Sequence, residues 1–354
     1  MSTDKEAVPN KDAVPNTDAV PADAARETAP PRSAHVVQGE PVESGEAIDA
    51  DEDLLDDLPE DAEEIDLTHM KVHSLKHLGL ERFPETKYAC FRRNMITNLK
   101  GVEKLPADLE NLDLYDNLIE RIDHHLEHFN TANNMEVLDL SFNNIRHIRH
   151  VQGLTHLKEL FLCQNAVTRI ENIDTLVNLT NLELGANSIR EIANLEPLVN
   201  LETLWIARNK IPRIQGLDTL TNLRLLSIQN NRITKIEGLD KLTNLEELYI
   251  SNNGIEVVEG LDNCPKLSTI DISYNRIKEL TGLSHLTELE ELWASGNQIE
   301  RLDSVERELR HLPNFSTIYL EYNPVQKNSG PMYRRKVQLA LGPSLVQIDA
   351  TPIR

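Results

Sequence analysis

Asparagine recurs at one fixed interval through most of this chain. Eight asparagines, from Asn143 to Asn297, are each 22 residues apart. Around each one the residues follow the frame L-x-x-L-x-L-x-x-N-x-I-x-x-I-x-x-L, as in the unit from Leu179 to Leu195. So regular a repeat constrains the chain to a stack of similar units, because one unit alone cannot bury its apolar side.

The residue types within the frame predict the shape of one unit. The segment L-x-L predicts a short strand whose alternate side chains point inward, and the asparagine that follows predicts a turn. The segment I-x-x-I-x-x-L has a period of three, which suits 3-10 or helical turns. This is the pattern of the leucine-rich repeat. We therefore expect an α/β solenoid shaped as a horseshoe, with a parallel β-sheet on its concave face and 3-10 or helical turns on its convex face.

The frame extends beyond the eight regular units. Units carrying Asn94 and Asn117 precede them and one carrying Asn323 follows, which makes eleven asparagine-bearing units. A degenerate unit that begins near Ile65 has Met70 at the asparagine position. The array is thus expected to hold 11 or 12 units over residues 63–329.

Two spacings and the end of the chain depart from this period. The spacing is 26 residues after Asn117 and again after Asn297, so we expect outer-side insertions within 123–134 and 303–313. Residues 332–337 have a helical pattern. We interpret residues 330–354 as a cap that shields the apolar edge of the last unit.

The first 66 residues have a different composition. They contain 20 acidic and four basic residues, seven prolines and no Phe, Trp or Tyr, within a chain whose net charge is −22. Such a segment cannot bury enough apolar surface to offset the entropy of ordering it. We expect residues 1–62 to form a disordered acidic tail. For its acidic block, 49–66, we favour a solubilising role over the alternative of a short motif that folds on a basic partner.

Charge, cysteine content and hydropathy argue against several classes of protein. An acidic chain is a poor ligand for nucleic acid phosphates. The three cysteines lack CxxC spacing, so they signal neither a disulfide framework nor a zinc cluster. No apolar run reaches the ~18 residues that span a bilayer, and the first residues lack the apolar core of a secretory signal. We expect a cytosolic or nuclear protein that binds neither nucleic acid nor membrane.

Residues between the inward leucines are expected to face the concave side. The residue four positions before each asparagine, from Asn117 on, is aromatic in five of ten units, although only 4% of the chain is aromatic. The position six before the asparagine adds Glu159, Glu247 and Glu291. Aromatic anchors among polar groups are typical of protein interfaces, and an acidic wall suits a partner with a basic patch. The alternative is a purely structural ladder of stacked rings. The row is Asp113, Asp139, Phe161, Glu183, Trp205, Ser227, Tyr249, Asp271, Trp293 and Tyr319.

The sequence contains one candidate metal cluster and no recognisable catalytic motif. His124 and His128 are four residues apart beside Asp123 and His125, which is a spacing that can hold a metal. Solvated polar side chains on the outer side are the favoured interpretation, so no metal and no cofactor are predicted. No Ser-His-Asp order, phosphate-binding glycine loop or carboxylate pair indicates an enzyme.

The end units add a resemblance to a known family. The stretches Ile65–His69, Leu138–Asn143 and Tyr319–Pro324, together with the uniform repeats, resemble the leucine-rich-repeat regulatory subunit of protein phosphatase 1, the regulatory subunit 7 family. The resemblance covers about residues 63–354. It implies a non-catalytic subunit that binds the phosphatase catalytic subunit through its concave face and modulates its activity or maturation. It also implies a location in the nucleus, and in the cytoplasm, with a role in mitosis and chromosome segregation.

The resemblance also implies which residues bind. The positions that match the family's concave face are Asp139, Phe161, Glu183, Trp205, Asp271, Glu291, Trp293 and Tyr319, to which the row itself adds Tyr249. The short basic-Val-x-Phe peptide of many phosphatase regulators is missing here, since Lys336–Leu339 lacks the aromatic residue. A further phosphatase inhibitor protein is a candidate third partner. The alternative function is a scaffold of a splicing or cytoskeletal complex.

Overall fold

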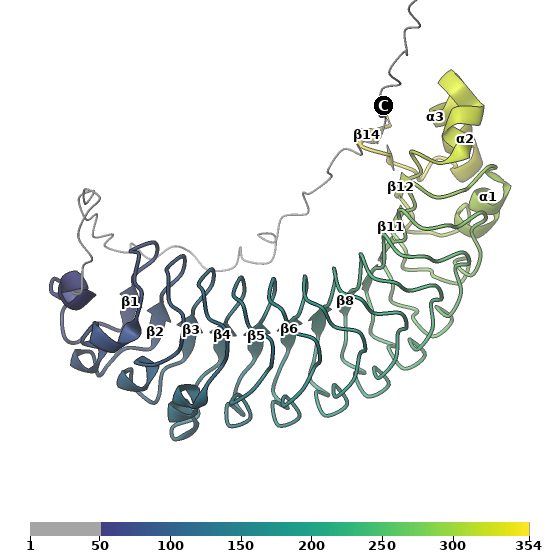
Figure 1. The fold of residues 1–354 in the computed structure, drawn as a ribbon. Coiled ribbons are helices and arrows are strands. Elements are labelled where there is room, and N and C mark those ends of the chain that lie inside the picture. The colour runs from purple at the N-terminus through teal and green to yellow at the C-terminus, as the bar shows by residue number, and fades with distance from the viewer. Residues whose placement is uncertain (1–50, 354) are drawn as a thin grey trace, which may run out of the picture. The chain divides into compact units, whose positions relative to one another are not determined.

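A single sheet of fourteen strands runs through residues 51–353, the part of the chain that the computed structural model describes. Neighbouring strands follow one another in sequence order, from β1 to β14. All pairs up to β13 are parallel and in register, and the last pair is antiparallel. The strands line the inner side of a curved stack of turns (Figure 1). The predicted leucine-rich-repeat solenoid is therefore confirmed.

The regular elements are short because each unit contributes only one strand and one turn. The strands are β1 (Glu64–Asp66), β2 (Tyr88–Cys90), β3 (Asn111–Asp113), β4 (Val137–Asp139), β5 (Glu159–Phe161), β6 (Asn181–Glu183), β7 (Thr203–Trp205), β8 (Leu225–Ser227), β9 (Glu247–Tyr249), β10 (Thr269–Asp271), β11 (Glu291–Trp293), β12 (Thr317–Tyr319), β13 (Gln347–Ile348) and β14 (Thr351–Pro352). The 3-10 helices are η1 (Asp51–Leu55), η2 (Leu75–His77), η3 (Leu80–Arg82), η4 (Val102–Lys104), η5 (His124–Asn130) and η6 (Gly330–Met332), and the α-helices are α1 (Asp303–Leu309), α2 (Pro324–Ser329) and α3 (Tyr333–Leu341).

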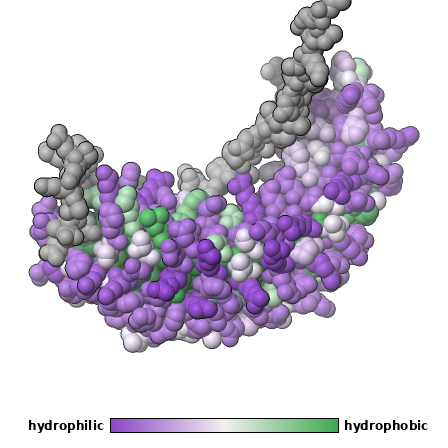
Figure 2. All heavy atoms as spheres, viewed as in Figure 1, coloured by the Kyte–Doolittle hydropathy of each residue, from purple (hydrophilic) through white to green (hydrophobic). Residues whose placement is uncertain are grey.

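One apolar core runs along the whole stack. The middle residue of each three-residue strand is buried, as in Leu182 of β6 and Leu204 of β7. These side chains join the leucines and isoleucines of the outer turns in a single cluster from Leu55 to Ile348. Each fully buried Leu or Ile contributes ~1.5–3 kcal/mol relative to an exposed one. In the view of Figure 2, hydrophilic residues cover most of the surface and hydrophobic ones show only in small patches.

The ladder asparagines, meaning the eleven repeat asparagines from Asn94 to Asn323, link each turn to the one before it. In Asn209, Nδ2 donates to the carbonyl oxygens of Leu184 (3.0 Å), Ile206 (3.2 Å) and Ala207 (3.1 Å). Its Oδ1 accepts from the backbone N–H of Ile189 at 2.9 Å. One amide thus satisfies four backbone groups that no strand pairing reaches, which is why the turn requires asparagine.

The two insertions lie where the spacing predicts, and both form helices, which the spacing did not indicate. They are η5 and α1, and each lies outside the sheet (Figure 1). The carboxylate of Glu308 in α1 is buried and accepts from the N–H groups of Leu283 and Ser284 at 3.1 Å. The insertion is therefore fixed to the preceding turn rather than projecting into solvent.

Helical structure begins before residue 330, where the sequence places the start of the cap, and the sheet continues into the cap segment. Helix α2 begins at Pro324, directly after the last ladder asparagine, and β13 and β14 continue the sheet within the cap. Asp349 follows β13, and its Oδ1 accepts from the N–H groups of Leu320 (2.9 Å) and Glu321 (3.1 Å). In the regular units a backbone carbonyl of the next strand takes this place, as Ser227 O does for the N–H of Ile206. Tyr333 also donates to Asp349 Oδ1, at 3.3 Å.

The array also begins earlier than the predicted boundary at residue 63. The acidic composition of residues 51–62 predicts that they belong to the tail, yet η1 lies within them. Leu55 is only 4% exposed and belongs to the core, with Leu54 and Leu58 packed against it. Leucines embedded among carboxylates thus close the first turn, and this part of the acidic block belongs to the array. The remainder of the predicted tail, residues 1–50, lies outside the described residues. Within residues 51–353, no helix is long and apolar enough to cross a membrane.

Candidate protein-binding wall on the concave face

The sheet places equivalent residues of successive units side by side on one face. The concave row is defined as the third residue of each strand from β3 to β12. In this register Glu183 pairs with Trp205, and Asp271 pairs with Trp293. Eight of the nine predicted binding residues belong to this row, and the ninth, Glu291, is the first residue of β11, on the same face. Their contact with a partner stays a prediction.

Three rings of the concave row form a cluster near the C-terminal end of the array. The centroids of Tyr249 and Trp293 lie 6.1 Å apart, and those of Trp293 and Tyr319 lie 5.7 Å apart, both in edge-on contacts. All three side chains are half-buried. The interpretation as stacked aromatic rings therefore holds for part of the row, and the same rings remain accessible to a partner.

Hydrogen bonds hold these rings in place. Trp293 Nε1 donates to Glu291 Oε2 at 3.1 Å, and the Tyr249 hydroxyl donates to Glu247 Oε2 at 2.6 Å. Burial and the adjacent Glu247 carboxylate raise the pKa of Tyr249, so its hydroxyl stays protonated as a donor. Gln347 of the cap donates to the Tyr319 hydroxyl at 2.6 Å. A partner that binds here meets oriented rings, which lowers the entropy cost of binding.

Gln347 is a member of this site that the repeat pattern does not predict. It comes from β13, which follows the last ladder asparagine and has no repeat position. The only available signal was the weak run Leu345–Ile348 after the cap helix, and this run does not indicate a contact with Tyr319. Side chains from the cap thus complete the aromatic cluster.

Two predicted binding residues are more buried than an exposed row implies. Asp139 and Asp271 are 2% and 7% exposed. Their Oδ1 atoms accept from the backbone N–H of Ser141 and Ser273, each at 2.9 Å and two residues further along the chain. Burial raises the pKa of Asp271. Both aspartates therefore also stabilise the turn that ends their strand, a role that the spacing Asp-x-Ser signals.

Glu183 occupies the middle of the concave row, between Phe161 and Trp205. Its Oε1 accepts from the backbone N–H of Gly185 at 2.9 Å. Burial raises the pKa of Glu183 to about 7, and burial also raises the pKa of the neighbouring Cys163 thiol to about 12. The centre of the wall therefore gains negative charge as pH rises through neutrality, while Cys163 stays an unreactive thiol.

The raised pKa of Glu183 predicts a pH-dependent stability. The folded state favours protonated Glu183, so this contribution to the free energy of unfolding is full below pH 4.5 and is lost as pH rises through about 7. We expect Glu183→Gln to gain about 1–3 kcal/mol relative to wild type between pH 4.5 and pH 8. Urea denaturation at both pH values measures this difference.

Glu246→Gln is the contrasting control, because a hydrogen bond from Arg224 lowers the pKa of Glu246. Its stability relative to wild type should change in the opposite direction with pH. A difference between Glu183→Gln and wild type that is the same at pH 4.5 and pH 8 would contradict the raised pKa.

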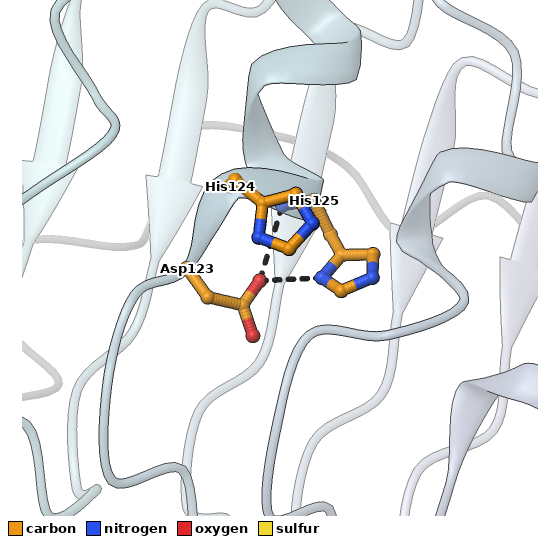
Figure 3. Close-up of side chains that lie close together, drawn as sticks. All are labelled: Asp123, His124 and His125. Atoms are coloured by element: carbon orange, nitrogen blue, oxygen red, sulfur yellow. Dashed lines mark hydrogen bonds and ion pairs between the residues drawn. The ribbon is translucent and has the colours of Figure 1, made fainter.

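The structure brings together Asp123, His124 and His125 at the start of η5 (Figure 3). Asp123 Oδ1 accepts from the backbone N–H of His125 at 3.1 Å and lies 2.8 Å from the Nδ1 atom of the same residue. Asp123 is thus the N-cap of this helix, which accounts for the cluster. His128 lies apart from it, with Nε2 2.9 Å from the carbonyl oxygen of Leu105. The prediction that no metal binds here stays untested.

The comparison with protein families agrees with this architecture. Residues 116–329 match the family model described as "Leucine-rich repeat region". The match covers more than half of the chain, so the chain belongs to this leucine-rich-repeat family. An internalin from Listeria monocytogenes has the same fold, with a TM-score of 0.63 and 22% identity over 85% of this chain and 94% of that chain.

More specific similarity comes from two named proteins. "Protein phosphatase 1 regulatory subunit SDS22" of Saccharomyces cerevisiae is 46% identical over 108 residues, or 30% of this chain and 31% of the yeast protein. "Protein phosphatase 1 regulatory subunit 7" of Homo sapiens is 57% identical over 47 residues, or 13% of this chain and 12% of the human protein. The matched segments thus span about a third or less of these relatives. The predicted resemblance to phosphatase 1 regulatory subunits is confirmed.

Proposed function

We propose that this protein is a non-catalytic regulatory subunit that binds the catalytic subunit of protein phosphatase 1 through its concave face. The single observation that carries the proposal is the aromatic cluster of Tyr249, Trp293 and Tyr319, oriented by carboxylates on a sheet of constant register. Such a surface supplies what a protein interface needs, namely rigid aromatic anchors ringed by polar groups. The names of the yeast and human relatives support the identity of the partner.

The carboxylates of this wall favour a basic partner surface. Glu159, Glu247 and Glu291 are the first residues of their strands and lie on the concave face beside the rings. Opposite charges on the phosphatase would accelerate association and fix its orientation. Modulation of phosphatase activity or maturation, an additional inhibitor protein in the complex, and action in the nucleus and during mitosis belong to this proposal through the family resemblance.

The test is a pulldown from nuclear extract with the full chain, analysed by mass spectrometry. Wild type should capture the phosphatase catalytic subunit, and a double variant, Trp205→Ala with Trp293→Ala, should lose it. Capture of splicing or cytoskeletal components without any phosphatase would refute the proposal and favour the scaffold alternative. Phosphatase assays of the captured complex then give the sign of the regulation.

A further inference from the structure

A second charged surface lies outside the concave wall, on the segments that follow three consecutive ladder asparagines. We call it the arginine patch and define it as Arg121, Arg146, Arg149 and Arg169, all of them exposed. Among residues 51–353, no carboxylate lies within 4.0 Å of their charged nitrogens. The patch is a concentration of positive charge on a chain whose net charge is −22.

In the repeat register, two arginines of this patch occupy positions that face each other, where other boundaries have a complementary pair. The side chain four residues after one ladder asparagine contacts the side chain six residues after the following ladder asparagine. This relation pairs His147 with Glu171 at 3.0 Å and Arg213 with Glu237 at 2.9 Å. At the boundary between the units of Asn117 and Asn143, the same two positions hold Arg121 and Arg149.

Two arginines therefore stand where other boundaries have complementary side chains. Like charges at contact positions cost free energy that an anion bound between them would recover. Arg146 and Arg169 add further positive charge on the same segments. A carboxylate at position 149 would complement Arg121 as at other boundaries, so charge pairing between units does not explain this arginine.

A hollow of about 590 Å³ opens beside Arg149. Its wall includes the side-chain amides of Asn130 and Gln152, which can donate to an anion. It also contains one carboxylate, that of Glu127, which is already bound to His150 Nδ1 at 2.7 Å. A second carboxylate, Glu120, is exposed next to Arg121 in the chain. Asp123 and Glu171, on the same segments, are bonded to His125 and His147. Three of these four carboxylates thus have a histidine partner, whereas none of the four arginines has a carboxylate partner among the described residues.

We propose that the arginine patch binds a phosphorylated segment of a protein. Each guanidinium presents a planar pair of N–H donors that matches two phosphate oxygens, and a phosphate carries more charge than a carboxylate. The patch lies outside the concave face, so a phosphorylated segment and a concave-face partner can be bound at once. The proposal therefore goes beyond the proposed function and does not depend on it.

The test measures fluorescence anisotropy of a labelled Gly-Ser peptide that carries two phosphoserines, with the full chain at 150 mM salt. Wild type should bind this peptide at least fivefold more tightly than the same peptide with two glutamates, and should not bind the unphosphorylated peptide. Arg149→Glu should weaken binding at least tenfold. Its thermal midpoint should not fall, because Arg121 then gains the opposite charge found at other boundaries.

Arg276→Glu is the matched control, since it makes the same change of charge at another exposed arginine. It should change the affinity by less than twofold. Equal losses in the two variants, or equal binding of all three peptides, would overturn the proposal. So would binding of heparin in the absence of phosphopeptide binding. A wild-type chain that binds phosphopeptide but captures no phosphatase would refute the proposed function alone.

Discussion

Trp293→Ala is expected to weaken binding of the phosphatase 1 catalytic subunit by about 1–3 kcal/mol, or roughly 5- to 150-fold. Trp293 is the central ring of the aromatic cluster and contacts both Tyr249 and Tyr319. Its truncation removes a large anchor and also releases the two neighbouring rings, so the entropy cost of binding rises. Isothermal titration calorimetry with the purified catalytic subunit measures the change.

Glu291 separates the effect of charge from that of shape. Glu291→Gln keeps an oxygen that can accept from Trp293 Nε1 and removes only the negative charge. We expect this variant to slow association and to lose about 1 kcal/mol of binding free energy, with a weaker dependence on salt than wild type. The effect of Glu291→Ala should be larger, because the indole then loses its hydrogen bond as well.

Leu339→Ala is the control for a large exposed side chain away from the wall, since Leu339 is 65% exposed on α3. It should bind as wild type does. Thermal midpoints of all variants show that the array is intact. If Trp293→Ala and Glu291→Ala are folded and bind normally, the concave wall is not the phosphatase site.

The fold was predictable from the sequence because every unit places the same apolar residue types and the same asparagine at the same positions. The 22-residue period determines the strand register, and the two 26-residue spacings give the positions of η5 and α1. The ends were less predictable, because an end unit has only one neighbour and follows no period. Leu55 closes the first turn from within an acidic block, and the Asp349 carboxylate accepts from the N–H of Leu320 where regular units use a backbone carbonyl.

The candidate site was predictable in position but not in environment. Period alone places Trp293 and Tyr319 on neighbouring strands of one face. It does not distinguish Asp271, buried and bonded to its own turn, from Glu291, which holds the indole. Those differences depend on the sizes of the neighbouring side chains and on the cap residue Gln347, which no repeat position signals.

Asn209→Leu is expected to lower the free energy of unfolding by about 3–5 kcal/mol, because a side chain of similar size replaces the amide without its polar atoms. The backbone N–H of Ile189 loses its only acceptor, whereas the carbonyl oxygens of Leu184, Ile206 and Ala207 each lose one of two donors. The unsatisfied N–H of Ile189 costs roughly 1–3 kcal/mol, and each hydrogen bond lost at a carbonyl oxygen that keeps another donor costs about 0.5–1.5 kcal/mol. Urea denaturation followed by circular dichroism measures the loss.

The position of Asn209 in the array decides how this loss appears. Stability in a repeat protein is close to a sum of unit and interface terms, so weakening the contact between Leu184 and Asn209 should uncouple the units on either side. We expect hydrogen exchange to accelerate in the two adjoining units first, and the urea transition to broaden or divide.

Asn200→Ala is the control. The exposed Asn200 makes one hydrogen bond, to the Val177 carbonyl oxygen at 2.9 Å, so this variant should lower the free energy of unfolding by less than about 1 kcal/mol. If the two variants lower the free energy of unfolding equally, the asparagine recurs along the array for a reason other than its four hydrogen bonds.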